Sequence, residues 1–95
     1  MIEYLIKRTD GEWFDLPAGS DPYRPTTIPF KREKGWGDGR ILVAGCVVSF
    51  SFEDPGIQVS FEGKIDNSLA DKVVDEVRQR IEQVSGQKGE VIRLT

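Results

Sequence analysis

The stretch SFSFEDPGIQVSFEG, residues 49–63, determines how the centre of this chain folds. Serine and phenylalanine alternate before Asp-Pro-Gly, and a second apolar–polar alternation follows it. Such alternation is typical of a strand with one buried face. With DPGI as a four-residue loop, Phe52 lies opposite Val59, and Phe50 lies opposite Phe61. All four side chains then share one buried face, so the sequence predicts a β-hairpin with a well-specified register.

Three acidic residues in this stretch, Glu53, Asp54 and Glu62, are candidates for a carboxylate site. In the predicted register the two glutamates are four positions apart along the ribbon, about 13 Å. That separation is too large for a shared proton and exceeds the carboxylate spacings of glycosidases. Asp54 suits the turn itself. We therefore interpret these residues as solvent-exposed and turn residues.

Three further segments upstream have strand patterns. Residues 41–52 predict one long strand, because their even positions are all apolar, and Gly45 within it predicts a bulge or a close packing contact. Residues 2–8 alternate and predict a strand with one face in the core. Residues 28–34 predict an edge strand, with Pro29 near its start.

The segment of residues 17–29 is rich in residues that interrupt regular structure. Proline fixes φ and lacks an N–H, so neither a helix nor a central strand is expected here. The segment predicts a long irregular loop, and such loops in compact domains tend to be functional or mobile. The interrupting residues are Pro17, Gly19, Pro22, Pro25 and Pro29.

A helix is predicted from Ser68 to residue 85, because apolar residues recur there at spacings of three and four. Ser68 begins an approximate capping box, and Gly86 suits the left-handed position that ends a helix. Glu76 and Arg80 are expected to form an i,i+4 ion pair. The apolar stripe consists of Ala70, Val73, Val74, Val77, Ile81 and Val84.

Residues 90–94 predict a final strand. It could pair beside the first strand, or lie parallel to residues 57–63 after a crossover. The whole chain, residues 1–95, is expected to form a single α+β domain. Its expected architecture is a four- to five-stranded, mainly antiparallel sheet, packed on one face by a single helix in the C-terminal half, in the order β-loop-β-β-β-α-β.

The composition argues against most catalytic chemistry. The chain has no histidine, which excludes His-based catalysis and His-ligated metals, and it has one cysteine. Cys46 lies among apolar residues and is expected to be buried. We expect no cofactor and no enzymatic activity. An enzyme would require acids distant in sequence, such as Asp10, Asp15 and Glu62, to meet in the fold.

The chain is expected to be cytoplasmic. It carries a net charge of −3, and no apolar run approaches the ~20 residues that span a bilayer. The N-terminus lacks the pattern of a signal peptide. A single cysteine cannot form an internal disulfide, so no oxidising compartment is needed. We expect no membrane partner.

Basic and aromatic residues interleave in residues 23–40. This segment contains five basic residues and two acidic ones, Glu33 and Asp38, so it carries a local excess of positive charge. Tryptophan and arginine are enriched at protein–protein hot spots, while aromatics mixed with cations are also typical of single-strand nucleic-acid binders. Burial of Phe30 and Trp36 in the core is the structural alternative. The candidate partner-binding residues are Tyr23, Arg24, Lys31, Arg32, Lys34, Trp36 and Arg40.

Our leading hypothesis is a small, non-catalytic protein-binding module, an inhibitor- or immunity-like partner of another protein. An acidic domain of this size could be steered onto a basic partner. The alternative is a nucleic-acid-binding accessory protein that uses residues 23–40 and whose binding weakens with salt.

Overall fold

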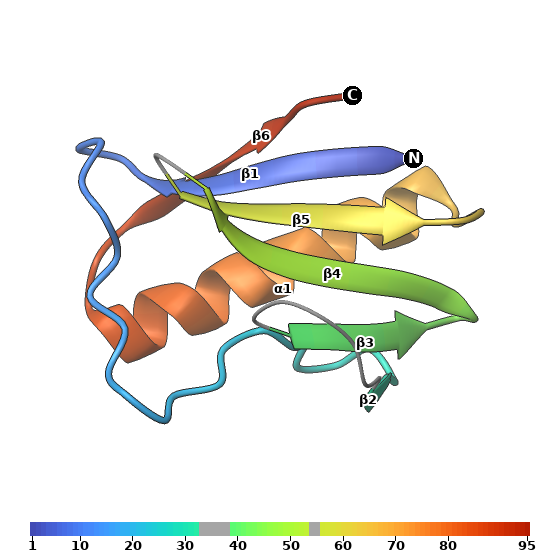
Figure 1. Cartoon of the computed structure of the whole chain (residues 1–95), viewed down its shortest axis with the longest axis horizontal. Coiled ribbons are helices and arrows are strands. Elements are labelled where there is room, and N and C mark those ends of the chain that lie inside the picture. Colours follow the sequence, from blue (N-terminus) through green and yellow to red (C-terminus); the bar gives the residue numbers. More distant parts are fainter. Residues whose placement is uncertain (33–38, 54–55) are drawn as a thin grey trace.

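The computed structural model describes residues 1–32, 39–53 and 56–95. Figure 1 shows a curved antiparallel sheet with one helix behind it. The strands run in the order β2-β3-β4-β5-β1-β6. This confirms the predicted α+β fold, with a sheet of six described strands instead of four or five. The elements are β1 (Ile2–Arg8), β2 (Lys31–Arg32), β3 (Gly39–Val43), β4 (Cys46–Glu53), β5 (Gly56–Glu62), α1 (Asn67–Ser85) and β6 (Gly89–Arg93).

The additional strand arises from a tight turn at Ala44 and Gly45. Val43 pairs with Cys46, so two residues connect β3 to β4. Their φ angles are 50° for Ala44 and 78° for Gly45. Positive φ at both central residues defines a type I′ turn, whose twist matches that of the flanking strands.

The prediction of one strand over residues 41–52, with a bulge or a packing contact at Gly45, is therefore wrong. The core residues occupy odd positions in β3 and even positions in β4. This change of parity is the sequence signal of the turn. Leu42 and Val47 obscure it, because they are apolar residues on the opposite, outer face of the sheet.

The β4–β5 hairpin has a register that differs by two residues from the predicted one. Phe50 lies opposite Val59, and Phe52 lies opposite Ile57. Gly56 and Ile57 belong to β5, so the predicted DPGI loop is wrong; its Asp-Pro positions lie outside the described residues. A shift of two residues leaves every side chain on the same face. The predicted faces are therefore correct, although the predicted pairs are not.

The observed N-cap of the helix lies two residues before the predicted one. Asp66 is the N-cap, and its carboxylate accepts hydrogen bonds from the backbone N–H groups of Ser68 and Leu69. These bonds satisfy N–H groups that have no partner within the helix. Gly86 ends the helix with φ of 73°, as predicted. No helix in the described part of the chain is long and apolar enough to cross a membrane.

Helix α1 packs its apolar stripe against the inner face of the sheet. Tyr4 of β1 donates a hydrogen bond from its hydroxyl to the Asp71 carboxylate. Burial, together with this bond and the negative charge of Asp71, raises the pKa of Tyr4 to about 12. The core of the sheet and helix includes Ile6, Ile41, Val48, Phe50, Val59, Phe61, Val73, Val77 and Ile81.

Strand β6 pairs antiparallel beside β1, which resolves the alternative left open by the sequence. Leu5 lies opposite Ile92, and Arg8 lies opposite Gly89. The predicted edge strand over residues 28–34 is limited to the two residues of β2 in the described part of the chain.

The strained turn provides a direct test of the β3–β4 hairpin. Ala44→Asn should raise the free energy of unfolding by about 0.5–1 kcal/mol, because asparagine tolerates positive φ better than alanine. Urea denaturation is the measurement. Ala18→Asn is the matched control, since Ala18 is exposed but does not have positive φ. An equal effect at both positions would contradict the type I′ turn.

Candidate functional site

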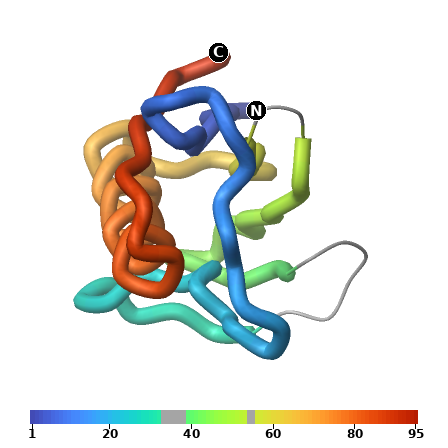
Figure 2. The backbone as a smooth tube through the Cα atoms, turned by 90° about the vertical axis from the view of Figure 1, so that its left-hand side faces the viewer, coloured from blue at the N-terminus to red at the C-terminus, as the bar shows by residue number. Residues whose placement is uncertain are grey.

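Residues 9–30, here called the strap, connect β1 to β2 without a regular element. Figure 2 shows the strap crossing one end of the molecule, between the helix and the sheet. The predicted irregular loop over residues 17–29 lies within it. Phe14, Tyr23 and Ile28 are buried in the common core. The strap therefore closes part of the core.

The carboxylate of Glu76 holds the strap against the helix. This side chain is 8% exposed. One oxygen accepts hydrogen bonds of 2.7 Å from the backbone N–H groups of Thr26 and Thr27, and the other accepts from the Thr27 hydroxyl. The predicted i,i+4 pair of Glu76 with Arg80 is therefore wrong. Its partners lie about fifty positions away in sequence.

The charge of Glu76 is favoured in the folded protein. Burial by itself raises the pKa of Glu76. The hydrogen bonds from Thr27 and Thr26, aided by the charge of Lys72, outweigh burial and hold the pKa below its ordinary value of 4.5. The ionised carboxylate thus stabilises the docked strap.

Two other contacts fix the first part of the strap. The Asp15 N–H donates to the Gln87 side chain at 2.8 Å, and the Gln87 amide donates back to the Asp15 carboxylate at 2.6 Å. The Arg8 guanidinium donates to the Trp13 carbonyl at 2.7 Å and pairs with Asp10 at 2.6 Å. The backbone on both sides of Trp13 is thus held in place.

Trp13 and Phe52, here called the aromatic pair, lie side by side at the surface. Their ring centroids are 6.2 Å apart, and the residues are 47% and 44% exposed. Beneath them, the buried Tyr23 ring lies 6.4 Å from Phe52 and stacks on Phe50 at 5.4 Å. A continuous series of rings thus connects the core to the surface.

The prediction that Phe52 is buried is wrong. Phe52 is on the same face as the buried Phe50, but it lies at the end of β4. Alternation along a strand identifies the face of a residue and does not show what covers that face.

Exposed carboxylates are neighbours in sequence of both members of the aromatic pair. The exposed Glu12 directly precedes Trp13, and the exposed Asp15 follows two residues after it. The exposed Glu53 directly follows Phe52. The nearby Arg8 is paired with Asp10. The segments that carry the two exposed rings are therefore rich in acidic residues.

The structure disperses the candidate partner-binding residues. Tyr23 is buried, and Arg24 is half-buried in the strap. Lys34 and Trp36 lie outside the described residues, so their part of the prediction is untested.

The remaining three candidates lie on β2 and β3. Arg32 pairs with Asp21, and its guanidinium lies 5.9 Å from the Phe30 ring centroid. Arg40 is on the outer face of the sheet, 2.8 Å from Glu62. Lys31 lines an open hollow of about 330 Å³ with Pro29, Phe30, Leu42, Ala44 and Gly45.

Cys46 and the acidic candidates do not form a reactive cluster. Cys46 is buried, as predicted, and burial together with the charge of Glu62 raises the pKa of its thiol. Asp10 and Asp15 are in the strap beyond the last residue of β1, whereas Glu62 is at the opposite end of the neighbouring β5. In the described ranges, no three potential metal ligands come together.

The aromatic pair was missed by sequence reasoning because Trp13 lies in a short segment without a clear pattern. Its partner Phe52 was assigned to the core. The only local signal was a tryptophan in an acidic context, Glu12-Trp13-Phe14-Asp15.

Comparison with known proteins found no matching family model, no matching curated protein and no matching solved structure.

The Glu76 contact predicts a pH-dependent contribution to stability. Glu76→Gln should lower the free energy of unfolding by about 1–2 kcal/mol at pH 7, because the amide lacks the charge and one acceptor oxygen. The pKa of Glu76 is lower in the folded protein than in the unfolded chain. The stability contributed by its carboxylate is therefore complete above the ordinary pKa of 4.5 and is lost as pH falls through the folded-state pKa. Urea denaturation across this range measures it.

The difference between the native protein and the Glu76→Gln variant should therefore shrink as pH falls below 4.5. Glu12→Gln is the control, because Glu12 is exposed and its substitution should change stability little. A Glu76→Gln effect that is constant with pH would exclude a role for the ionised carboxylate.

Proposed function

We propose that this protein is a non-catalytic binding module that docks on a basic segment of another protein through the aromatic pair. The observation that carries this proposal is that Trp13 and Phe52 lie in contact distance and are both substantially exposed, in segments that also carry exposed acidic residues. The proposal keeps the protein-binding hypothesis from the sequence, but it places the binding site at the aromatic pair instead of residues 23–40.

The aromatic pair has the properties of a binding hot spot. Tryptophan is among the residues most enriched in hot spots, and adjacent aromatic rings offer a large apolar area. Lysine or arginine side chains bind over the face of tryptophan, and the exposed carboxylates in the same segments would add attraction at longer range. These features favour a partner segment that combines basic and apolar side chains.

The anchoring of the strap supports the same proposal. Binding costs less free energy when the contact surface is already ordered. The Asp15–Gln87 and Arg8–Trp13 contacts fix the backbone that carries one ring, and strand β4 carries the other. The partner would therefore meet a preformed surface.

The nucleic-acid alternative has less support. Asp21 and Glu62 neutralise Arg32 and Arg40, which that hypothesis needs for phosphate contacts. The ring of Tyr23 is buried and cannot stack on a base without rearrangement.

The first experiment compares four forms of the protein as affinity baits in native lysate: the unaltered chain, Trp13→Ala, Phe52→Ala and Leu94→Ala. Leu94 is as exposed as Trp13 and lies away from the aromatic pair, so its variant is the matched control. A specific partner should be retained by the unaltered chain and by Leu94→Ala, and lost with the other two baits.

Calorimetry with the purified partner then measures affinity. Trp13→Ala should weaken binding at least tenfold, about 1.4 kcal/mol, and binding to the unaltered chain should weaken as salt rises. Equal binding by Trp13→Ala and the unaltered protein would rule out this surface. A partner whose binding segment is acidic would rule out the charge argument.

A further inference from the structure

Strand β6 forms an edge of the sheet that ends in exposed apolar side chains. Val91 is 36% exposed and Ile92 is 40% exposed, and Leu94 follows directly after the strand. Met1 is exposed beside them, since its carbonyl accepts a hydrogen bond from the Thr95 hydroxyl. Within the described ranges, the large exposed apolar side chains thus fall into two groups, the aromatic pair and this edge.

The two edges of the described sheet differ in their protection against pairing. Edge strands expose unpaired backbone groups, and proteins usually blunt them with short strands, charges, proline or bulges. As far as the chain is described, strand β2 comprises Lys31 and Arg32, both exposed. Strand β6 has five residues, lacks proline and pairs in regular register with β1. The β6 edge is therefore the less protected edge.

The charged residues of β6 are engaged within their own chain. Glu90 pairs with Lys7 at 3.3 Å. The Arg93 guanidinium lies 5.7 Å from the Tyr4 ring centroid and donates to the Asn67 side chain at 3.1 Å. Both charged side chains are thus bound to groups of their own chain. Neither extends outward from the edge, where its charge would oppose the pairing of another strand.

The direction of the backbone groups follows from the bonds to β1. Leu94 donates its N–H to the Glu3 carbonyl, and the Lys88 carbonyl accepts from Thr9. Residues of an antiparallel strand alternate between their two neighbours, so the even positions of β6 face β1. The N–H and carbonyl groups of Val91 and Arg93 therefore point outward from the sheet.

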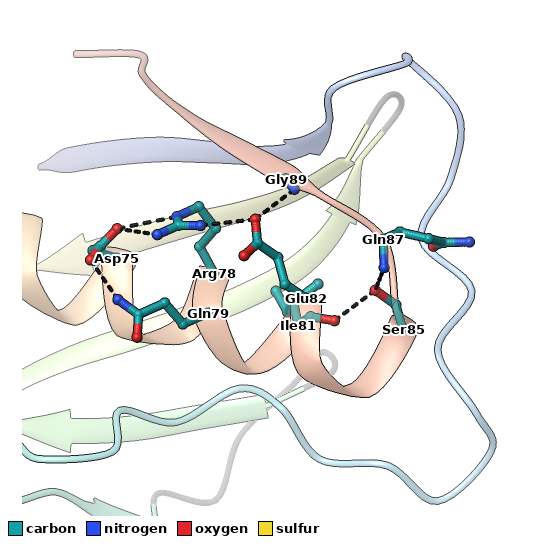
Figure 3. Close-up of polar contacts among 8 residues, drawn as sticks. All are labelled: Asp75, Arg78, Gln79, Ile81, Glu82, Ser85, Gln87 and Gly89. Atoms are coloured by element: carbon teal, nitrogen blue, oxygen red, sulfur yellow. Dashed lines mark hydrogen bonds and ion pairs between the residues drawn. The ribbon is translucent and has the colours of Figure 1, made fainter.

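At the start of this edge, a side chain of helix α1 occupies an outward backbone group. The Gly89 N–H donates to the Glu82 carboxylate at 2.9 Å, and Glu82 also pairs with Arg78 at 2.8 Å. Figure 3 shows this contact and shows the chain rising away from the helix beyond Gly89. The outward groups of Val91 and Arg93 lie in this later part of β6.

One antiparallel pairing of β6 with a copy of itself satisfies these outward groups. If Ile92 lies opposite Ile92 of the second copy, Val91 lies opposite Arg93, and each can exchange backbone N–H···O=C bonds with the other. The Gly89 N–H, already bonded to Glu82, is not needed. Shifting the two-fold axis to Arg93 would instead place like charges opposite each other, which is unfavourable.

The same register brings apolar side chains together. Ile92 lies opposite Leu5 on the outer face of the sheet. Two copies of Ile92 would meet at a non-hydrogen-bonded pair, where side chains approach most closely. The outer face would then carry a continuous apolar row from Leu5 of one copy to Leu5 of the other.

We propose that β6 pairs antiparallel with β6 of a second copy, with a two-fold axis at Ile92, and so joins two sheets into one. The interface is isologous, because the same strand supplies both sides. It is small and therefore belongs to the weak, concentration-dependent class. This proposal is independent of the aromatic pair and of its partner.

Sedimentation velocity of the full chain tests the association. The mass should rise from 10.7 kDa toward about twice that value as concentration increases from roughly micromolar to roughly millimolar. Ile92→Lys places like charges on the two-fold axis and should weaken association at least tenfold, while Trp13→Ala should associate like the unaltered protein. A monomer at every concentration, or association unchanged by Ile92→Lys, would overturn the proposal.

Disulfide cross-linking tests the register without relying on a disruptive variant. Non-hydrogen-bonded partners lie at a Cα separation that suits a disulfide. Ile92→Cys should therefore form a covalent dimer under mild oxidation. Glu90→Cys should not, because the two copies of residue 90 would be about 13 Å apart along the ribbon. The unaltered chain, whose Cys46 is buried, is the blank.

Rapid dimer formation by Ile92→Cys alone supports the two-fold axis at Ile92. Failure of Ile92→Cys to cross-link, or equally fast cross-linking of Glu90→Cys, would overturn it.

Discussion

A single helix cannot cover the inner face of a sheet this wide, and the hydrogen bonds of Glu76 hold the segment that covers the rest. Strands lie about 4.8 Å apart, so six described strands span well over 20 Å, whereas a helix with its side chains is about 10–12 Å across. The strap supplies Phe14, Tyr23 and Ile28 to the uncovered part of the core. It has no regular backbone hydrogen bonding of its own, so a carboxylate on the helix binds two of its N–H groups.

Because the helix covers one part of the sheet and the strap covers another, aromatic rings reach the surface at one end. The strap is thin and covers the core only where its own side chains turn inward. At the end of β4 the apolar face continues to Phe52, and Trp13 packs against it without enclosing it. The exposed rings are thus an extension of the core through Tyr23 and Phe50. The exposed rings are therefore supported from below by the packed rings of the core.

Local patterns in the sequence predict the parts of the fold that depend on periodicity. The apolar stripe predicts the helix, Gly86 predicts its end, and alternation assigns the faces of β4 and β5. The patterns fail where the outcome depends on distant contacts. Nothing near Glu76 shows that Thr26 and Thr27 will be its partners, and the tight turn at Ala44 is hidden by apolar residues on the outer face.

The aromatic pair and the β6 edge are separate in the fold, and this separation gives the two proposals a joint consequence. Pairing at Val91 and Arg93 uses the later part of β6, whereas the strap residues beside Trp13 contact Arg8 and Gln87, next to the first residue of β6. A dimer would therefore carry two aromatic pairs at fixed positions. Two linked weak sites bind a partner with repeated basic segments more tightly than either site alone, because the second contact is intramolecular. Weak self-association would then convert a modest contact at each aromatic pair into concentration-dependent avidity.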